Sequence, residues 1–420
     1  MRTRLAYAAL GLLTALPAAA VSRVVDEDNQ ATTGDCDALL TTPRTFMTIQ
    51  AAIDASASGD TIFVCPGTYD EQPEIFGKSL TITGRGNATV NPAPMDDNST
   101  NLFSGIPIAA GILVEDATNV SIGSIAVDGT DNGGTDCTKN PVGIYYRNAS
   151  GTVRDVAVRN MKLGPGLEGC QGGTGVFVQS GLAGSSSVSV LGSSIHSYQK
   201  NGITGNELGT TLTARENRVT GLGPTPFIAQ NGIQIGFGAA GGIEDNVIAN
   251  HVYTACTSPS SCTAAATGVL IFEAADGVMV RSNTVAHGQV GILAQSNGMT
   301  IGGNANRSND ITQTLVFDGI AVVGDNNLVR GNNVTHSDRS GIFIEGTGNT
   351  IRNNRINEAP IGVWNFSGTN TIPPPPPGLR NTFFNVGVAI HSGMTPPAVS
   401  TLLREAAARL GRMAVPSPVR

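Results

Sequence analysis

The stretch RGNNVTHSDRSGIFIEGTGNTIRNNRI, from Arg330 to Ile356, contains the pattern that decides the fold. It begins and ends with the same motif, Arg-x-Asn-x-Val/Ile, and the two copies start 22 residues apart. Between them stands a second motif, a glycine followed by a β-branched residue, at Gly341-Ile342. Short β-branched segments separated by glycine and asparagine suit strands joined by tight turns. A repeat of this length therefore predicts β-coils stacked along one axis.

Both motifs recur over most of the chain. The glycine motif occurs eleven times, at spacings of 21 to 36 residues. A period that grows only by insertion predicts a solenoid in which equivalent residues of successive coils form columns. The asparagines of the second motif would then stack as a buried ladder, with side-chain amides hydrogen-bonded in register. The expected members of this ladder are Asn217, Asn246, Asn283, Asn309, Asn332 and Asn354.

The first coil resembles the opening of pectin-lyase-like β-helix proteins. The segments that carry this resemblance are Thr48–Ala55, Gly59–Val64, Pro66–Tyr69 and Lys78–Gly84. In that superfamily the first segment is an amphipathic helix over the end of the solenoid, and Ile49, Ala52 and Ile53 have helical spacing. The later coils resemble the generic repeat of the same superfamily, which includes periplasmic proteins that assist copper-site assembly in nitrous-oxide reductase. The resemblance implies an all-β fold, a single-stranded right-handed parallel β-helix with an N-terminal capping helix.

The two ends of the chain differ from the repeat. Residues 1–20 look like a signal peptide, with an early positive charge, an apolar run and a small-residue cleavage site. We expect an N-terminal segment over 21–44, the β-helix over 45–392, and a C-terminal tail or short capping helix over 393–420. A five-proline run, Pro373 to Pro377, is predicted to form an extended loop, and Val399 to Leu410 the helix. The signal peptide predicts a secreted or periplasmic protein.

Six cysteines fit such an oxidising compartment. They allow 15 connectivities, and pairing in sequence order is the simplest hypothesis. It joins Cys36 to Cys65, Cys137 to Cys170, and Cys256 to Cys262. A zinc site is the weaker alternative, because the chain has no Cys-x-x-Cys motif and no nearby histidine pair.

Composition argues against several function classes. The 420 residues include 53 glycines, and only 14% are charged, which favours short strands over helices. The net charge is −7 and no basic stripe is present, so we expect no nucleic-acid partner. No stretch after the N-terminus is long and apolar enough for a membrane span. We expect a monomer.

Four long insertions suggest where a ligand binds. They separate the asparagine turn from the next glycine strand, so all four are expected at one edge of the stack, as a wall beside a sheet. They are Asp128–Val142, Met161–Thr174, Gly221–Asn231 and Asn250–Thr267. Strand alternation turns several aromatic and polar side chains outward beside this wall, where they could bind a sugar chain. We assign as substrate-binding residues Tyr145, Arg147, Phe177, Gln179, Gln234 and, on the wall itself, Lys162. The alternative is that the aromatic side chains simply pack beneath the insertions.

Two further groups could carry chemistry. Asp128, Asp131 and Asp136 on the wall could bind calcium, although solvated loop carboxylates are the alternative. No other cofactor is expected. Four residues after successive ladder asparagines stand Asn250, His287, Gln313, His336 and Glu358, which should form one column. His287 and His336, with the nearby Asp338 and Arg339, are candidate general acid/base residues. Polar residues at an exposed turn explain the same pattern.

The function predicted from these features is binding or modification of an acidic polysaccharide by an exported β-helix protein. If it is an enzyme, the resemblance implies a polysaccharide lyase or a uronate epimerase. The closely spaced aspartates of polygalacturonases are absent from the strands, and no lyase or epimerase signature is recognisable. The alternative is a non-catalytic secreted or periplasmic binding or structural protein. We expect the ligand beside the insertions of the early coils, with the histidine column as the second candidate.

Overall fold

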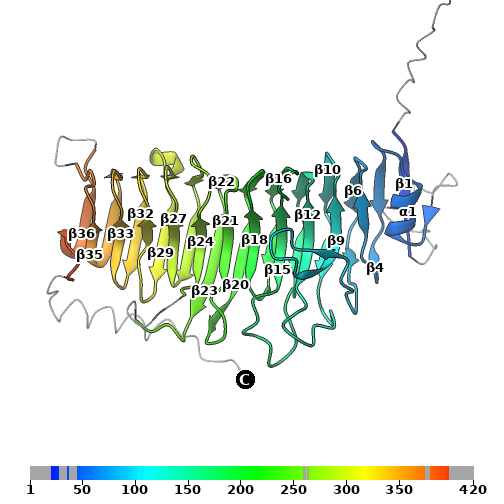
Figure 1. The fold of residues 1–420 in the computed structure, drawn as a ribbon, viewed down its shortest axis with the longest axis horizontal. Helices are drawn as coiled ribbons and strands as arrows, with labels where there is room; N and C mark the ends of the chain where they lie inside the picture. The colour runs from blue at the N-terminus through cyan, green and yellow to red at the C-terminus, as the bar shows by residue number, and fades with distance from the viewer. Residues whose placement is uncertain are drawn as a thin grey trace, which may run out of the picture.

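The computed structural model describes residues 20–27, 36, 45–258, 262, 264–373 and 379–396. Three segments considered above lie outside these residues: the signal peptide except for its last position, the proline run after Pro373, and the expected helix Val399–Leu410. The described chain winds into one elongated cylinder of parallel strands (Figure 1). The predicted solenoid is therefore confirmed.

One 13-stranded sheet runs along the cylinder, and neighbouring strands in it are parallel. It consists of β1 (Ser22–Val25), β2 (Thr45–Phe46), β3 (Thr61–Val64), β6 (Thr81–Gly84), β10 (Val120–Gly123), β13 (Ser150–Arg154), β16 (Ser186–Leu191), β19 (Thr210–Arg215), β22 (Ala240–Glu244), β25 (Met279–Arg281), β28 (Thr300–Ile301), β31 (Leu328–Arg330) and β34 (Thr350–Arg352). Strand β1 pairs with β3, so the solenoid takes up residues of the expected N-terminal segment.

The remaining 23 strands form a second sheet with two rows. The glycine row, named for the first motif, contains β5 (Glu74–Phe76), β9 (Pro107–Glu115), β12 (Pro141–Arg147), β15 (Thr174–Gln179), β18 (Asn201–Asn206), β21 (Asn231–Gly236), β24 (Thr267–Phe272), β27 (Val290–Gln295), β30 (Ile320–Val323) and β33 (Ser340–Glu345). The asparagine row, which follows the ladder, contains β4 (Gly67–Tyr69), β7 (Ala88–Val90), β11 (Ala126–Asp128), β14 (Ala157–Arg159), β17 (Ser194–His196), β20 (Arg218–Thr225), β23 (Val247–Tyr253), β26 (Thr284–Gly288), β29 (Asp310–Thr314) and β32 (Asn333–Ser337). The long strands β35 (Arg355–Ser367) and β36 (Thr382–Ser392) run through both rows, and β8 (Ser99–Thr100) pairs antiparallel with β9.

The predicted asparagine ladder is present. Each member donates its side-chain amide to the side-chain oxygen of the next, over 2.9 to 3.0 Å, from Asn217 through to Asn381. The six predicted members are at most 1% exposed. A second, shorter ladder, which the motifs did not indicate, joins Asn327, Asn349 and Asn370 at another turn. These amides satisfy turns that are closed off from water.

The recurring glycines stack in a column because a side chain there has no space. A Cβ atom on Gly175 would lie 2.6 Å from the carbonyl oxygen of Gly202 in the next coil and 2.5 Å from Ile195 Cγ2. The φ angle of Gly175 is not in the left-handed region, so close approach of the backbones, rather than turn geometry, requires the glycine.

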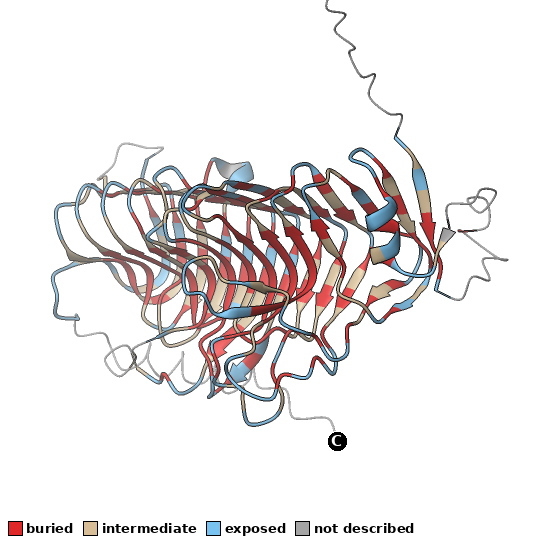
Figure 2. Ribbon diagram, turned by 45° about the vertical axis from the view of Figure 1, so that its right-hand side comes forward, coloured by how far each residue is buried: buried red, intermediate tan, exposed pale blue. Residues whose placement is uncertain are grey.

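The core is one continuous column of valine and isoleucine side chains inside the cylinder. Figure 2 shows buried residues recurring along the inner strands of successive coils. Helix α1 (Ile49–Ala55) lies at the N-terminal end and buries Ile49, Ala52 and Ile53 in this core, as their spacing predicted. Thr48 caps the helix by accepting a hydrogen bond from Ala51 N at 3.2 Å. That the helix covers the end of the solenoid stays a prediction. A short 3-10 helix, Ala305–Arg307, is a local insertion.

All three predicted disulfides are formed, with Cα–Cα distances of 5.9 Å for Cys36–Cys65, 5.2 Å for Cys137–Cys170 and 5.1 Å for Cys256–Cys262. They fit the predicted oxidising location. No helix in the described ranges has the length and hydropathy needed to cross a bilayer.

A histidine is buried where the asparagine row turns toward the glycine row. His251 is fully buried, and its Nε2 hydrogen-bonds with the equally buried hydroxyl of Tyr198. Burial disfavours the charged imidazolium and lowers the pKa of His251 to about 3. In the unfolded chain the pKa is about 6.5, so between these values the unfolded state binds more protons than the folded state.

We therefore expect acid to destabilise the fold through His251. The stabilising contribution is complete above the unfolded pKa and falls as the pH drops, by about 2 kcal/mol between pH 7 and pH 5. In His251→Gln the position no longer titrates, and the amide can still accept from Tyr198. Urea unfolding at several pH values should show a wild-type-minus-variant difference in unfolding free energy that shrinks by this amount on acidification. If the unfolding free energies of wild type and variant change equally with pH, His251 is not the group responsible.

Candidate functional site

The insertions lie along one side of the cylinder, as predicted, and hang beside β15, β20 and β23 in Figure 1. Cys137–Cys170 joins the first two, and Gly164 N donates to Gly134 O at 3.1 Å. Asp131 and Lys162, from these two insertions, line one shallow hollow of about 520 Å³. Lys162 is exposed there. The first two insertions therefore form the predicted wall, and this disulfide and hydrogen bond join them.

The expected calcium ligands are not gathered into one site. Asp128 accepts hydrogen bonds from Arg159 Nε at 2.7 Å and Asn160 Nδ2 at 2.8 Å. Burial acts to raise the pKa of Asp128, but its hydrogen bonds to Asn160, Thr130 and Arg159 together hold it below the usual value. Asp136 is exposed and bonded to its neighbour Thr138. Within the described part of the chain, no three His, Cys, Asp or Glu residues are placed to hold a metal ion. Calcium binding stays a prediction without support from these residues.

The expected aromatic platform faces outward but is covered. Tyr145 and Phe177 stack with ring centroids 5.1 Å apart, and they are 0% and 5% exposed. The segment Asn98–Pro107 (the cover segment), which includes β8, crosses over them. Tyr145 Oη donates to Thr100 O at 3.2 Å, and Leu102 N donates to Gln179 Oε1 at 2.9 Å. The assignment of Tyr145, Phe177 and Gln179 as ligand contacts was therefore wrong for this conformation. They pack beneath an insertion that the sequence motifs had not singled out.

Arg147 is also engaged. It forms an ion pair with Glu115 of the preceding coil, and the two side chains are only 20% and 16% exposed. Burial raises the pKa of Glu115, with Arg147 opposing that shift. Because its charge is already neutralised, Arg147 is not available to pair with a uronate carboxylate.

The histidine column exists, but the catalytic set does not assemble. Asn250, His287, Gln313, His336 and Glu358 all have left-handed backbone, with φ between 51° and 66°. His336 pairs with Glu358, whereas Arg339 pairs with the buried Asp318 and lies 4.5 Å from the centre of the Phe343 ring. Asp338 accepts from Val316 N at 2.9 Å, and burial raises its pKa. Among the described residues, no hydrogen bond or ion pair joins His336 to Asp338 or Arg339. His287 is exposed in its turn. These residues form separate local contacts at the surface.

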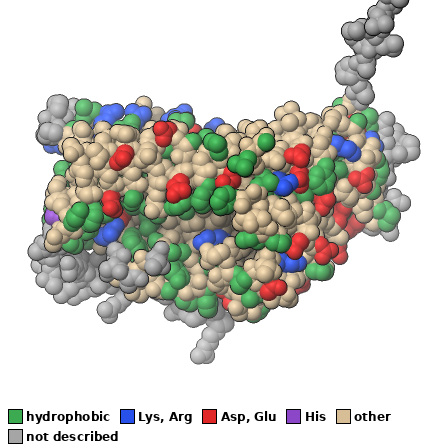
Figure 3. Space-filling view, viewed as in Figure 1, with side chains coloured by type: hydrophobic (Ala, Val, Ile, Leu, Met, Phe, Trp, Pro, Cys, Tyr) green, Lys and Arg blue, Asp and Glu red, His purple; other side chains and the backbone are tan. Residues whose placement is uncertain are grey.

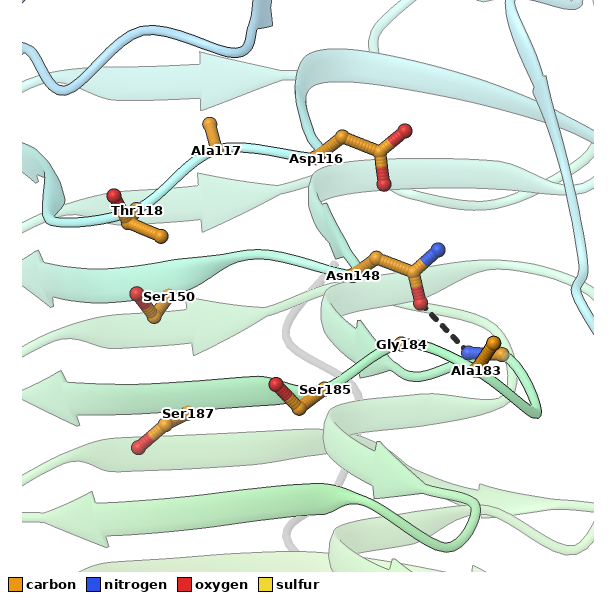
Figure 4. A pocket seen from close by; sticks show the side chains of 10 residues that line it. Asp116, Ala117, Thr118, Asn148, Ser150, Ala183, Gly184, Ser185 and Ser187 are labelled. Atoms are coloured by element: carbon orange, nitrogen blue, oxygen red, sulfur yellow. Dashed lines mark hydrogen bonds between the residues drawn. The ribbon is translucent and has the colours of Figure 1, made fainter.

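Figure 4 shows a second hollow, of about 650 Å³, at the turns that follow β9 and β12. Asn148 Oδ1 accepts from Gly181 N at 2.7 Å, which fixes the loop on one side. Serines, glycines and alanines make up most of its lining, with Asp116 as its single ionisable group. Such a lining offers hydroxyl and backbone contacts but no acid/base pair.

A connected set of amides occupies the outer face of the glycine row just beyond the covered platform. The amide cluster consists of Asn201 and Asn206 on β18 and Asn231 and Gln234 on β21. Asn231 Nδ2 donates to Asn201 Oδ1 at 3.1 Å and to Gln234 Oε1 at 3.3 Å. Gln234 Nε2 donates to Asn206 Oδ1 at 3.0 Å. The predicted contact Gln234 is thus placed in a polar floor, and Asn201 and Asn206 are half-buried at its edges.

The hydroxyl of Thr204 lies between Asn201 and Asn206 on the same outward face of β18. Thr204 is 2% exposed, and its Oγ1 has no hydrogen-bond partner anywhere in the described residues. A buried hydroxyl without a partner costs about 1 to 3 kcal/mol, so such groups usually mark a place for water or a ligand.

An exposed aromatic ring borders the amide cluster. Phe237 follows β21 with φ 55°, an uncommon backbone for a bulky residue, and is 41% exposed. Its ring lies 5.3 Å from that of Phe272 on the next coil. Between Phe237 and the amides stands Gly236, where a Cβ would lie 3.5 Å from Asn206 Oδ1. In Figure 3 this side of the molecule is recessed near its middle, with hydrophobic and acidic side chains around the recess and a Lys or Arg side chain within it. The outer-face site comprises the amide cluster, Thr204, Phe237 and Phe272.

Solved structures share this architecture. The GH136 lacto-N-biosidase from Eubacterium ramulus superposes with a TM-score of 0.55 at 10% identity, over 89% of this chain and 68% of that one. The chain is a right-handed parallel β-helix. Two other proteins of this fold give lower scores. The periplasmic alginate epimerase AlgG has a TM-score of 0.43 at 14% identity, over 80% and 77% of the two chains. Pectate lyase Pel9A has 0.42 at 13%, over 91% and 81%.

One family model matches part of the sequence. The model of the periplasmic copper-binding protein (NosD) family matches residues 225–386. No curated protein matches. The described residues of the matched region contain no group of three His, Cys, Asp or Glu placed to hold a metal ion. The match agrees with the fold and with the repeat motifs of this β-helix.

Proposed function

We propose that this β-helix binds a polysaccharide along the outer face of its glycine row, at the outer-face site. The half-buried amides of Asn201 and Asn206 offer hydrogen-bond donors and acceptors that match sugar hydroxyls, and the buried Asn231 and Gln234 hold them in place. The rings of Phe237 and Phe272 offer a surface for the apolar face of a sugar ring. The name of the lacto-N-biosidase refers to a glycan, but the residues of this chain are what support glycan binding here.

The exposed Phe237 ring carries the proposal. Phe237 has the left-handed backbone of the turn that also follows β18 and β24, and this turn places a large apolar ring in water beside polar amides. A sugar would contact the ring and the amides at once.

The residues of the site favour a neutral glycan over the acidic one expected from the fold family. None of the outer-face residues is an arginine or lysine. Glu207 and Glu273 stand in the turns next to Phe237, so a uronate carboxylate would meet like charge there. The predicted cation Arg147 is paired with Glu115.

Phe237→Ala is expected to weaken binding of neutral oligosaccharides by roughly ten- to fiftyfold, because it removes the stacking surface. Isothermal titration calorimetry with neutral hexose, N-acetylhexosamine and uronate oligosaccharides of about six sugars measures this. Phe384→Ala is the matched control, since Phe384 is 47% exposed on β36, far along the axis. An equal loss in both variants, or binding of uronate oligosaccharides alone, would count against the proposal.

A further inference from the structure

Arginine side chains line one edge of the last coils, at the turn that contains the asparagine ladder. Arg330 and Arg352 end β31 and β34 and are register partners, so they lie side by side on neighbouring strands. The residues before them, Val329 and Ile351, belong to the core, so alternation turns both arginines outward. Figure 3 shows Lys and Arg side chains along the upper left edge of the molecule, over the C-terminal coils.

Two more arginines stand beside the ladder in the last two coils. Asn354 Nδ2 donates to Asn381 Oδ1 at 3.0 Å, which places the turns of these coils next to each other. Arg355 directly follows the first of these asparagines, and Arg380 directly precedes the second. Both arginines are exposed. The arginine row, as we call it, consists of Arg330, Arg352, Arg355 and Arg380. No single run of sequence shows it, because its members come from three coils.

The charges of the arginine row are not neutralised within the described chain. No ion pair formed there includes any of the four guanidinium groups. Arg330 Nε is buried, and it has no hydrogen-bond partner among the described residues. The segments 328–334, 350–357 and 366–384, which contain the row, have no aspartate or glutamate. The row is thus a local excess of positive charge in a chain whose net charge is −7.

The same column contains arginines that are neutralised in earlier coils. Strand pairing continues the column from β19 through β22, β25, β28 and β31 to β34. On β19, Arg215 pairs with Asp245 at 3.2 Å, and on β25, Arg281 pairs with Glu244 at 2.7 Å. Like charges directly opposite each other on neighbouring strands are destabilising. The fold accepts carboxylates beside this column, so it does not itself require the unpaired arginines of the last coils.

The ladder holds the backbone beneath the arginine row. Arg330 O accepts from Asn332 Nδ2 at 3.3 Å, and Arg352 O accepts from Asn354 Nδ2 at 3.1 Å. Neighbouring strands are about 4.8 Å apart, so successive coils present guanidinium groups at a short, regular spacing along the axis. A guanidinium group can donate two parallel hydrogen bonds to a carboxylate or a sulfate. Such an array fits a linear partner that has an anionic group on each repeating unit.

We propose that the arginine row binds an extended acidic polysaccharide through its carboxylate or sulfate groups. The row lies at the turn between the 13-stranded sheet and the asparagine row, whereas the outer-face site lies on the glycine row. The inference is therefore independent of the proposed function. Proteins that bind single-stranded nucleic acid use successive aromatic rings for base stacking. In the described chain the one ring that contacts the arginine row is Phe384, 4.8 Å from Arg355, which favours a polysaccharide.

The test titrates the full-length protein with polygalacturonate oligosaccharides of about ten sugars, and with dextran sulfate, in a calorimeter at low salt. Arg330→Gln and Arg352→Gln should each weaken binding by about three- to tenfold, and the double variant by more than about tenfold. Affinity should also depend less on salt in the double variant, because fewer counterions are released. Neutral oligosaccharides should not compete with either polyanion.

Arg215→Gln is the matched control, because Arg215 stands in the same column but is paired with Asp245. It should bind both polyanions within about twofold of wild type, since a neutralised surface charge contributes little. Circular dichroism melting checks the fold of each variant. Removing one of two facing arginines relieves repulsion, so the melting temperatures of Arg330→Gln and Arg352→Gln should not fall.

The other possible results overturn the proposal. They are an equal loss of affinity in Arg215→Gln, unchanged affinity in the double variant, and no binding of either polyanion by wild type. Tighter binding of single-stranded DNA, or of vesicles that contain phosphatidylglycerol, would assign the row to another class of partner. Failure of neutral oligosaccharides to bind wild type contradicts the proposed function alone and leaves the arginine row assigned.

Discussion

Gly175→Ala is expected to lose about 3 to 5 kcal/mol of unfolding free energy, among the largest effects of any single substitution. The added Cβ would lie 2.6 Å from the carbonyl oxygen of Gly202 and 2.5 Å from Ile195 Cγ2. Neither neighbour can move freely, because the carbonyl belongs to the paired strand β18 and the isoleucine to the core. Urea unfolding followed by circular dichroism measures the loss.

The control for this prediction is Gly242→Ala. Gly242 lies on β22, and a Cβ there would have only ordinary contacts, 3.6 Å from Met279 O. This variant should stay within about 1 kcal/mol of wild type. If both alanine variants are equally stable, close approach of the coils is not what requires glycine in this column.

Asn309→Ala should destabilise the protein by a similar amount, about 3 to 5 kcal/mol, by interrupting the ladder in its middle. Asn309 Oδ1 accepts from both the backbone N and the side-chain amide of Asn283 at 3.0 Å. Its own amide donates to Val280 O at 2.8 Å and to Asn332 Oδ1 at 2.9 Å. Alanine leaves these buried groups without partners and adds a cavity too small to hydrate them well. The same urea experiment gives the value.

Asn304→Ala provides the comparison for the ladder. Asn304 is five residues away, exposed, and makes no capping hydrogen bond with its side chain. Its removal should change the unfolding free energy by less than about 0.5 kcal/mol. A loss at Asn309 no larger than at Asn304 would show that the stacked amides contribute little.

The fold could be predicted because its determinants repeat in the sequence. Asn309 and Gly175 have the same local surroundings as their equivalents in every neighbouring coil, so their spacing reports the register directly. The disulfide between Cys137 and Cys170 was predictable for a related reason, since both cysteines stand in insertions at the same place in adjacent coils. The second ladder was missed because its asparagines, such as Asn349, lie outside the arginine-containing motif.

The candidate site was harder to predict because it depends on what covers each outward side chain. Alternation placed Tyr145 on the outer face correctly, but only the folded chain shows that Thr100, 45 residues earlier, lies over it. Gln234 follows the same in-and-out alternation of side chains, and it lies at the floor of the recess. The signal for Phe237 was its position directly after the strand in a turn, next to Gly238. Sequence periodicity gives no information about which such turn residues are exposed.

The three disulfides are distributed unevenly along the β-helix, so its two ends should differ in mechanical stability. Cys137–Cys170 is the last that joins one coil to the next, because Cys256–Cys262 closes a loop within a single insertion. Beyond it, the coils are held together without covalent cross-links, by paired strands, ladder amides and core contacts, and each coil touches chiefly its two neighbours. Under tension or heat, we expect such a rod to unfold first at its C-terminal end. The outer-face site on β18 to β24 lies next to the part that is cross-linked by disulfides, so we expect it to keep its shape after the last coils have unfolded.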